Sequence, residues 1–156
     1  MNPSDPKLHI SAWLLIACGV WLIGLGAYFI AVRPPLLPED LRYMDVTLSQ
    51  IRIAAPFLES WLSKVFTVLG GFIAGTGVLT VFVATATKTY QPMATSWAIA
   101  VTGVLTVGLM SAINFALASD FKWLLLIPAL LWCQSGSLRR RAPQEGINLE
   151  RHRCEL

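Results

Sequence analysis

Four long apolar stretches, separated by short polar segments, form the pattern of this chain. They cover residues 10–32, 65–87, 93–118 and 121–138, and none holds an ionisable residue deep inside it. A helix needs about 20 apolar residues to cross the hydrocarbon core of a bilayer, which is about 30 Å thick. The pattern therefore predicts an all-α membrane protein, built as a bundle of four transmembrane helices.

The fourth stretch differs from the other three because only residues 123–133 are firmly apolar. These residues include Pro128, and the segment 134–137 that follows them is polar. Proline is tolerated in a membrane helix when neighbouring groups satisfy the carbonyl that it leaves without a donor, and a bilayer can thin locally around a short helix. We therefore expect this stretch to cross as well, which places both ends of the chain on one side.

One long loop, residues 33–64, separates the first two stretches and has a pattern of its own. Thr47 and Gln50 have the spacing of a capping box, which starts a helix. Apolar residues then recur every three or four positions, as on one face of an amphipathic helix that Pro56 kinks or divides: Leu48, Ile51, Ala55, Leu58, Trp61 and Leu62. Such a helix could be a lid over a groove between spans, or a connector that hides its apolar side in lipid.

Charge sets the expected orientation. The arginine run Arg139, Arg140 and Arg141 directly follows the fourth span and opens a basic tail, residues 139–156. Seven Lys and Arg residues lie on the side of the two ends and five on the other side. Positive residues favour the cytoplasmic side and bind anionic lipid head groups. We therefore predict cytoplasmic termini, with the three arginines as the lipid head-group and orientation anchor.

The composition favours one membrane domain over residues 1–156. The tails and loops outside the spans are too short to close a second hydrophobic core. The net charge of +3 is spread along the chain and does not indicate a nucleic-acid partner. The small size and the lack of organelle signals favour a bacterial inner membrane.

Small residues predict where helices approach one another. Gly71 and Gly75 form a G-x-x-x-G pair in the second span, and Gly108, Ala112 and Ala116 follow at steps of four in the third. Small side chains let membrane helices come close, since a hydrophobic drive is absent between helices in lipid. We expect these faces to pack within the chain, with homodimerisation as the alternative.

Chemistry-bearing residues are few. Asn114 is the one strongly polar side chain well inside the third span, where it could bond a neighbouring helix or contact a ligand. The cysteines at 18, 133 and 154 form no C-x-x-C pair, and no nucleophile–base pair or metal-ligand set is visible. The sequence therefore predicts neither catalysis nor a cofactor or metal.

The predicted function is non-enzymatic. We expect an accessory or structural protein that acts through contacts with the lipid bilayer, with another membrane protein or with a second copy of itself. The alternative is a transporter or a binder of a lipophilic ligand, with its site near Asn114 and the first loop.

Three short motifs carry a resemblance to a known group of proteins. The segment 37–44, the Thr47-x-x-Gln50-Ile51 pattern and the glycine pair at 70–71 together resemble small uncharacterised bacterial membrane proteins with four spans. In that family a short basic stretch with histidine precedes the glycines, whereas residues 62–65 read Leu-Ser-Lys-Val here. The resemblance covers about 40 residues, and it implies the four-span architecture but no activity.

Overall fold

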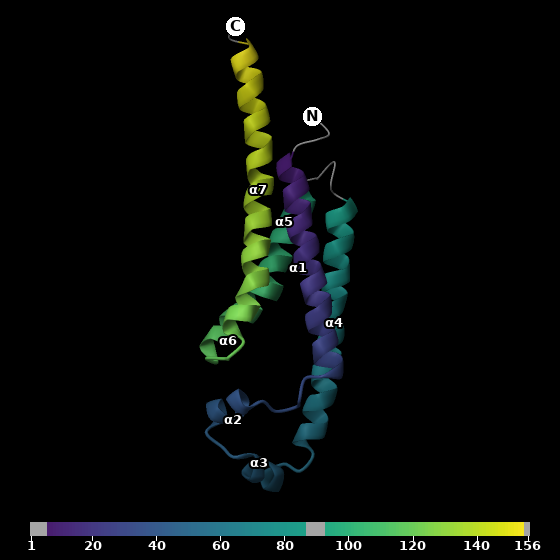
Figure 1. The fold of residues 1–156 in the computed structure, drawn as a ribbon, viewed down its shortest axis with the longest axis vertical. Coiled ribbons are helices and arrows are strands. Elements are labelled where there is room, and N and C mark those ends of the chain that lie inside the picture. Colours follow the sequence, from purple (N-terminus) through teal and green to yellow (C-terminus); the bar gives the residue numbers. More distant parts are fainter. Residues whose placement is uncertain (1–5, 87–92, 155–156) are drawn as a thin grey trace.

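The computed structural model describes the backbone of residues 6–86 and 93–154. Within these ranges every regular element is a helix (Figure 1), which confirms the predicted all-α class. The elements are α1 (Pro6–Ala31), α2 (Pro38–Met44), α3 (Leu48–Ala54), α4 (Leu58–Ala86), α5 (Met93–Gly103), the π-helical turn η1 (Val104–Gly108), α6 (Leu109–Ala116) and α7 (Lys122–Cys154).

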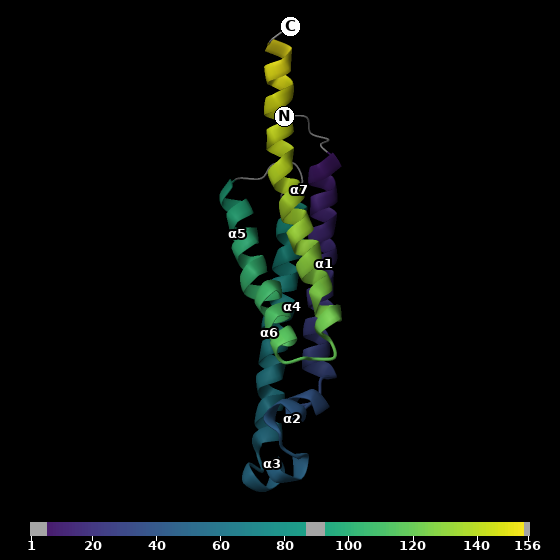
Figure 2. The same cartoon turned by 90° about the vertical axis from the view of Figure 1, so that its left-hand side faces the viewer.

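The long helices run along one axis, and the two short helices lie beyond one end of them. Helix α1 packs against both α4 and α7, while α7 also packs against the continuous run of α5, η1 and α6. Figures 1 and 2 show α2 and α3 at one end of the molecule, with the first and last described helical turns towards the other. The chain therefore begins and ends on the same side of the bundle.

Three helices are long and apolar enough to cross a membrane: His9–Ala31, Leu58–Ala86 and Ala94–Ala116. They correspond to the first three predicted spans, although α4 starts at Leu58 rather than at residue 65. The fourth predicted span, residues 121–138, is the first half of α7, which continues as helix through the basic tail to Cys154. Because polar residues make up the second half of α7, its length alone does not make it a span.

In the loop between α1 and α4, the predicted amphipathic stretch is divided at Pro56 rather than kinked there. The capping box is present, because Gln50 N–H donates to Thr47 Oγ1 over 3.3 Å and Thr47 N–H donates to Gln50 Oε1 over 2.8 Å. Helix α3 nevertheless ends at Ala54, and Leu58 already begins α4. Pro56 explains the break, since a residue before proline avoids helical angles, and Ala55 has φ −144° and ψ 77°.

Glycines bring α1 and α4 into backbone contact. Gly26 faces Gly70, and Gly19 faces Gly77, so each helix presents two glycines seven residues apart. A Cβ placed on Gly70 would lie 2.7 Å from the carbonyl oxygen of Gly26, and one on Gly77 would lie 2.6 Å from that of Gly19. These two points of close approach fix the register of the antiparallel pair.

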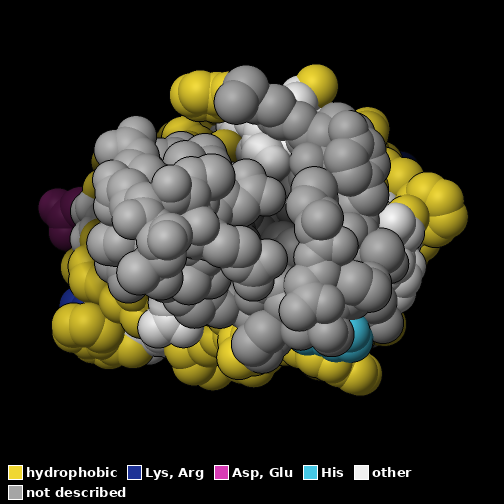
Figure 3. Space-filling view, turned by 90° about the horizontal axis from the view of Figure 1, so that it is seen from above, with side chains coloured by type: hydrophobic (Ala, Val, Ile, Leu, Met, Phe, Trp, Pro, Cys, Tyr) yellow, Lys and Arg dark blue, Asp and Glu magenta, His cyan; other side chains and the backbone are white. Residues whose placement is uncertain are grey.

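The molecule turns many of its large apolar side chains outward. Its buried core is small and centres on Leu15, Cys18, Leu22, Val107 and Trp132. Large exposed side chains occur on all of the long helices; for example, Phe72 of α4 is 73% exposed. Viewed from the end that carries the termini, the rim outside the grey atoms is mostly hydrophobic (Figure 3). This distribution suits lipid as the surrounding solvent.

Candidate functional site

Two serines hold the start of α1 against the middle of α7. Ser11 Oγ donates to the carbonyl oxygen of Ser135 over 3.0 Å, and Ser135 Oγ donates to the carbonyl oxygen of Ser11 over 3.1 Å. Both side chains are fully buried. Since each hydroxyl and each carbonyl gains a partner, the pair joins the helices without leaving a polar group in the apolar core.

Pro128 lies in the buried seam of α7, and side chains of two other helices donate to backbone carbonyls next to it. Ser111 Oγ of α6 donates to the carbonyl oxygen of Leu125 over 2.8 Å. Cys18 Sγ of α1 donates to the carbonyl oxygen of Pro128 itself over 3.5 Å. These two side-chain donors tie α7 to α1 on one side and to α6 on the other.

Trp132 attaches α7 to α5. Its indole N–H donates to the carbonyl oxygen of Ile99 over 3.0 Å, and its ring lies directly against Gly103, where a side chain would collide with it. Only 6% of this tryptophan is exposed. The sequence pattern did not predict this contact; Gly103, just before the π-helical turn, was the one signal that could have indicated it.

A groove runs between α4 and α5, above a floor made by α1 and α7. Its volume is ≈ 550 Å³. The walls are Thr76, Leu79, Thr80 and Val83 of α4 and Ala94, Thr95, Ala98, Ile99 and Thr102 of α5, with Leu15 and Trp132 below. The groove exists because α4 packs on α1 while α5 packs on α7, so that the two walls have different supports.

The threonine hydroxyls of the α4 wall bond within their own helix. Thr76 Oγ1 donates to the carbonyl oxygen of Phe72, and Thr80 Oγ1 donates to that of Thr76, both over 2.8 Å. Such bonds to the preceding turn are typical of threonine in membrane helices. The groove therefore offers an occupant a mainly hydrocarbon surface with a few hydroxyl oxygens as acceptors.

Arg33 lies at the end of the bundle near α2 and α3, where its side chain contacts three other residues. Its guanidinium carbon lies 3.6 Å from the ring centre of Phe66 and 5.1 Å from that of Phe29, and one nitrogen lies 3.6 Å from a carboxylate oxygen of Asp40. Burial lowers the pKa of Arg33, an effect that the charge of Asp40 opposes. The residue thus joins α1, α2 and α4 through cation–π and ionic contacts.

Helix α2 is fastened to the turn between α6 and α7. Ser119 Oγ donates to Glu39 Oε1 over 3.0 Å. Arg42 reaches the carbonyl oxygen of Ala118 over 3.4 Å and lies 3.8 Å from a carboxylate oxygen of Asp120. These contacts bring the first loop across the end of the bundle, and they are made by α2, which precedes the predicted amphipathic helix.

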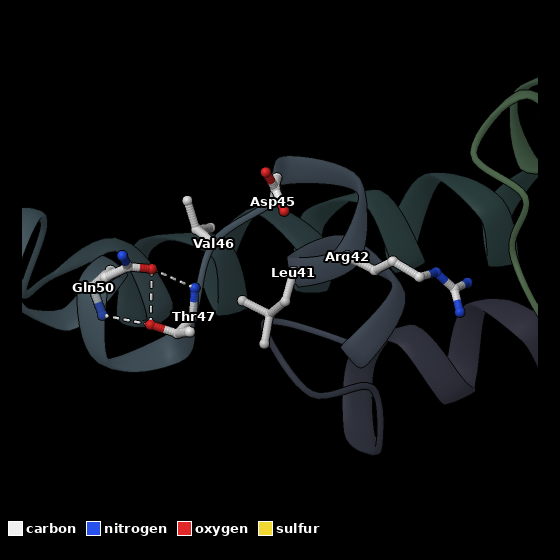
Figure 4. Close-up of a pocket in the computed structure, with 6 residues that line it drawn as sticks. All are labelled: Leu41, Arg42, Asp45, Val46, Thr47 and Gln50. Atoms are coloured by element: carbon white, nitrogen blue, oxygen red, sulfur yellow. Dashed lines mark hydrogen bonds between the residues drawn. The ribbon is translucent and has the colours of Figure 1, made fainter.

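A second, shallow pocket of ≈ 270 Å³ lies between α2 and α3. Figure 4 shows its six lining residues, with the Thr47–Gln50 capping bonds on one side and the Arg42 guanidinium directed away from the others. Its polar groups serve the capping box, and the pocket is open. It therefore has no arrangement of side chains aimed at a ligand.

Among the described residues, Gly71 and Gly75 make no close approach to another helix. A Cβ added to Gly71 or Gly75 would meet no atom within 4 Å beyond its own helix backbone, whereas Gly70 and Gly77 make the contact with α1. The face of α4 that packs against α1 therefore carries Gly70 and Gly77, which are seven residues apart. It differs from the predicted face, which carries Gly71 and Gly75, four residues apart. The open face carrying Gly71 and Gly75 leaves the predicted homodimerisation untested.

The ladder predicted in the third span also faces outward for most of its length. Ala112 and Ala116 are exposed, and the nearest atom to a Cβ on Gly108 would be the carbonyl oxygen of Gly103 in the same helical run, at 3.4 Å. Gly103 is the small residue that packs on α7 instead. The π-helical turn η1 lies between Gly103 and α6. It changes which residues of this helical run share a face, so regular steps of four do not identify the packing face.

Asn114 is half-buried and bonds within its own helix. Its side-chain N–H donates to the carbonyl oxygen of Met110 over 2.9 Å. The predicted bond to another helix is not among the contacts of the described residues, and the groove lies elsewhere. The arginines at 139–141 lie on the continuous helix α7, and the described side chains end before them.

No family model, curated protein or solved structure matches this chain significantly. Among the described residues, no group of three or more His, Cys, Asp or Glu side chains could hold a metal ion. The resemblance to four-span bacterial proteins stays a prediction.

Proposed function

We propose that this chain is a non-enzymatic membrane protein with four spans that works through contacts inside the bilayer. The first half of α7 is the fourth span, both termini are cytoplasmic, and the membrane is the inner membrane of a bacterium. The groove of ≈ 550 Å³ between α4 and α5 is the observation that carries this proposal, since it is a formed, mainly apolar recess between two membrane-spanning helices.

The fourth span follows from how α7 is held. Its apolar half packs against α1 and against the α5–α6 run, and buried serines bond it to α1. A helix that packs against two segments long and apolar enough to cross, with its buried polar groups satisfied, can cross together with them. The arginines at 139–141 then stand at the cytoplasmic interface, as positive residues do.

Thiol labelling tests the proposed topology. Ser49→Cys is exposed in the loop before α4, whereas Cys154 lies in the basic tail. We expect a membrane-impermeant maleimide to label Ser49→Cys in intact spheroplasts and to label Cys154 only after lysis. Labelling of both sites, or of Cys154 alone, in intact spheroplasts would refute the proposed arrangement.

Native mass spectrometry of the protein, extracted gently from its own membrane, tests the function. We expect the chain to carry a stoichiometric second component, either lipid or protein. A bare monomer in all mild detergents, with full helical content by circular dichroism, would contradict a role through intramembrane contacts.

The alternative of a transporter or lipophilic-ligand binder near Asn114 has less support. The amide of Asn114 already has an acceptor in its own helix, and the pocket of the first loop is shallow and open. If this alternative holds, the lipophilic ligand binds in the groove between α4 and α5 and not near Asn114. Flux measurements on Asn114→Leu distinguish the two, because wild-type transport in that variant would exclude the Asn114 site.

A further inference from the structure

We propose that the groove between α4 and α5 holds one acyl chain of an anionic phospholipid, whose head group lies at the end of the bundle that carries both termini. This inference rests on the proposed function and names the class of ligand for its groove. It follows from the length of the groove, its position along the bilayer, its volume and the distribution of charge.

The groove matches the depth of one leaflet. From Ala94 to Thr102 its α5 wall covers eight helical steps, or about 12 Å at 1.5 Å per residue. Half of the hydrocarbon core is about 15 Å. Val83 and Ala94 lie close to the ends of their helices at Ala86 and Met93, so the groove starts near the interface and ends near the middle of the bilayer.

The volume suits a chain better than a helix. A helix with its side chains is about 10 Å wide, so a 12 Å length of it would need roughly 900 Å³. The groove offers ≈ 550 Å³. The hydroxyl hydrogens of Thr76 and Thr80 are used within α4, so an occupant without polar groups leaves the donors of the α4 wall satisfied.

Charge identifies the head group. By sequence, the loop end of the molecule holds five basic and five acidic residues, whereas the end with the termini holds seven basic and four acidic ones. All of the net charge of +3 therefore lies at the end where the groove opens. On α7, Arg139 lies seven residues beyond Trp132, about 10 Å along the helix. Because Trp132 contacts Ile99 and Gly103 of α5, this distance brings Arg139 to the level of Ala94. Anionic head groups are attracted to such a basic end.

The test uses purified protein in micelles with equal amounts of phosphatidylglycerol and phosphatidylcholine, both carrying palmitoyl and oleoyl chains, and counts retained lipids by native mass spectrometry. Ala98→Phe fills the groove, and Ala112→Phe is its control, since Ala112 is an exposed alanine of the same span outside the groove. A third variant replaces Arg139, Arg140 and Arg141 by Gln.

We expect the wild type to retain one phosphatidylglycerol with a preference of about tenfold or more, given roughly fivefold for each basic residue near the surface. Ala98→Phe should lose this lipid and Ala112→Phe should keep it. The arginine variant should keep a lipid without the preference. Helical content by circular dichroism shows that each variant is folded.

Equal retention of both lipids by the wild type would overturn the inference, as would unchanged retention by folded Ala98→Phe. A protein subunit cross-linked to position 98 in the native membrane would also overturn it, while leaving the proposed function intact. The proposed function fails separately, if gentle extraction of the native protein yields neither lipid nor partner.

Discussion

Replacing Gly70 with alanine tests whether α1 and α4 touch through their backbones. A Cβ at this position would lie 2.7 Å from the carbonyl oxygen of Gly26, 2.8 Å from Cγ1 of Ile30 and 2.9 Å from Cβ of Phe29. These atoms include backbone and cannot move aside alone, so the helices must separate locally. Gly71→Ala is the matched control, because open space surrounds the next residue in the same helix.

The magnitude follows from two opposing terms. Overfilling a tight contact costs about 1–3 kcal/mol, while alanine gains about 1 kcal/mol over glycine within a helix. Both variants gain the same helical propensity, so the difference between their unfolding free energies measures the cost of the collision. We expect Gly70→Ala to be less stable than Gly71→Ala by about 1–3 kcal/mol, a factor of roughly 5 to 150 in the unfolding equilibrium constant.

Unfolding in mixed micelles with increasing SDS, followed by tryptophan fluorescence, measures the difference. The pair Gly77→Ala and Gly75→Ala repeats the comparison at a second contact, because a Cβ on Gly77 would lie 2.6 Å from the carbonyl oxygen of Gly19, whereas a Cβ on Gly75 would face open space. Equal stabilities within either pair would refute the contact. A larger loss for Gly71→Ala or Gly75→Ala would show that the predicted small-residue face is the packing face.

Three smaller predictions concern polar side chains. Ser11→Ala and Ser135→Ala should show a coupling energy of about 0.6 kcal/mol, and at most about 1.7 kcal/mol, in a double-mutant cycle of unfolding free energies; additive losses would contradict the bond. Trp132→Phe should lower stability by about 1 kcal/mol, since it removes the N–H that donates to Ile99 but keeps most of the ring; an unchanged midpoint would contradict this. Asn114→Leu should leave lipid retention in the native mass spectrum unchanged, because its amide bonds its own helix; loss of lipid would revive the Asn114 site.

The sequence predicted the long helices because their apolar runs are strong and local. It also predicted the capping box at Thr47 and Gln50, which depends on residues three positions apart. Pro56 predicted a kink or a division, but the pattern did not show that the residues after it belong to α4, because the apolar recurrence continues past Pro56 into that helix. Periodicity reports a shared face and carries no information about a break in the backbone.

The contacts between helices were harder to predict because the sequence offers several small residues in each span. The chain has 11 glycines, and the four-residue spacing of Gly71 and Gly75 is a familiar motif. The structure uses Gly70 and Gly77 instead. Which face is used depends on where Gly19 and Gly26 lie on α1, and a pairing between two helices cannot be read from either one alone.

The same pairing sets the width of the groove. Helix α4 is held by its glycine contacts with α1, and α5 is held by Trp132 and the carbonyl of Ile99 on α7. The serine pair between Ser11 and Ser135 then joins these two supports. A change that separates α1 from α4 therefore moves one wall of the groove while the other stays on α7. For this reason Gly70→Ala should weaken lipid retention as well as stability, whereas Ala98→Phe should remove the lipid and leave the α1–α4 contact unchanged.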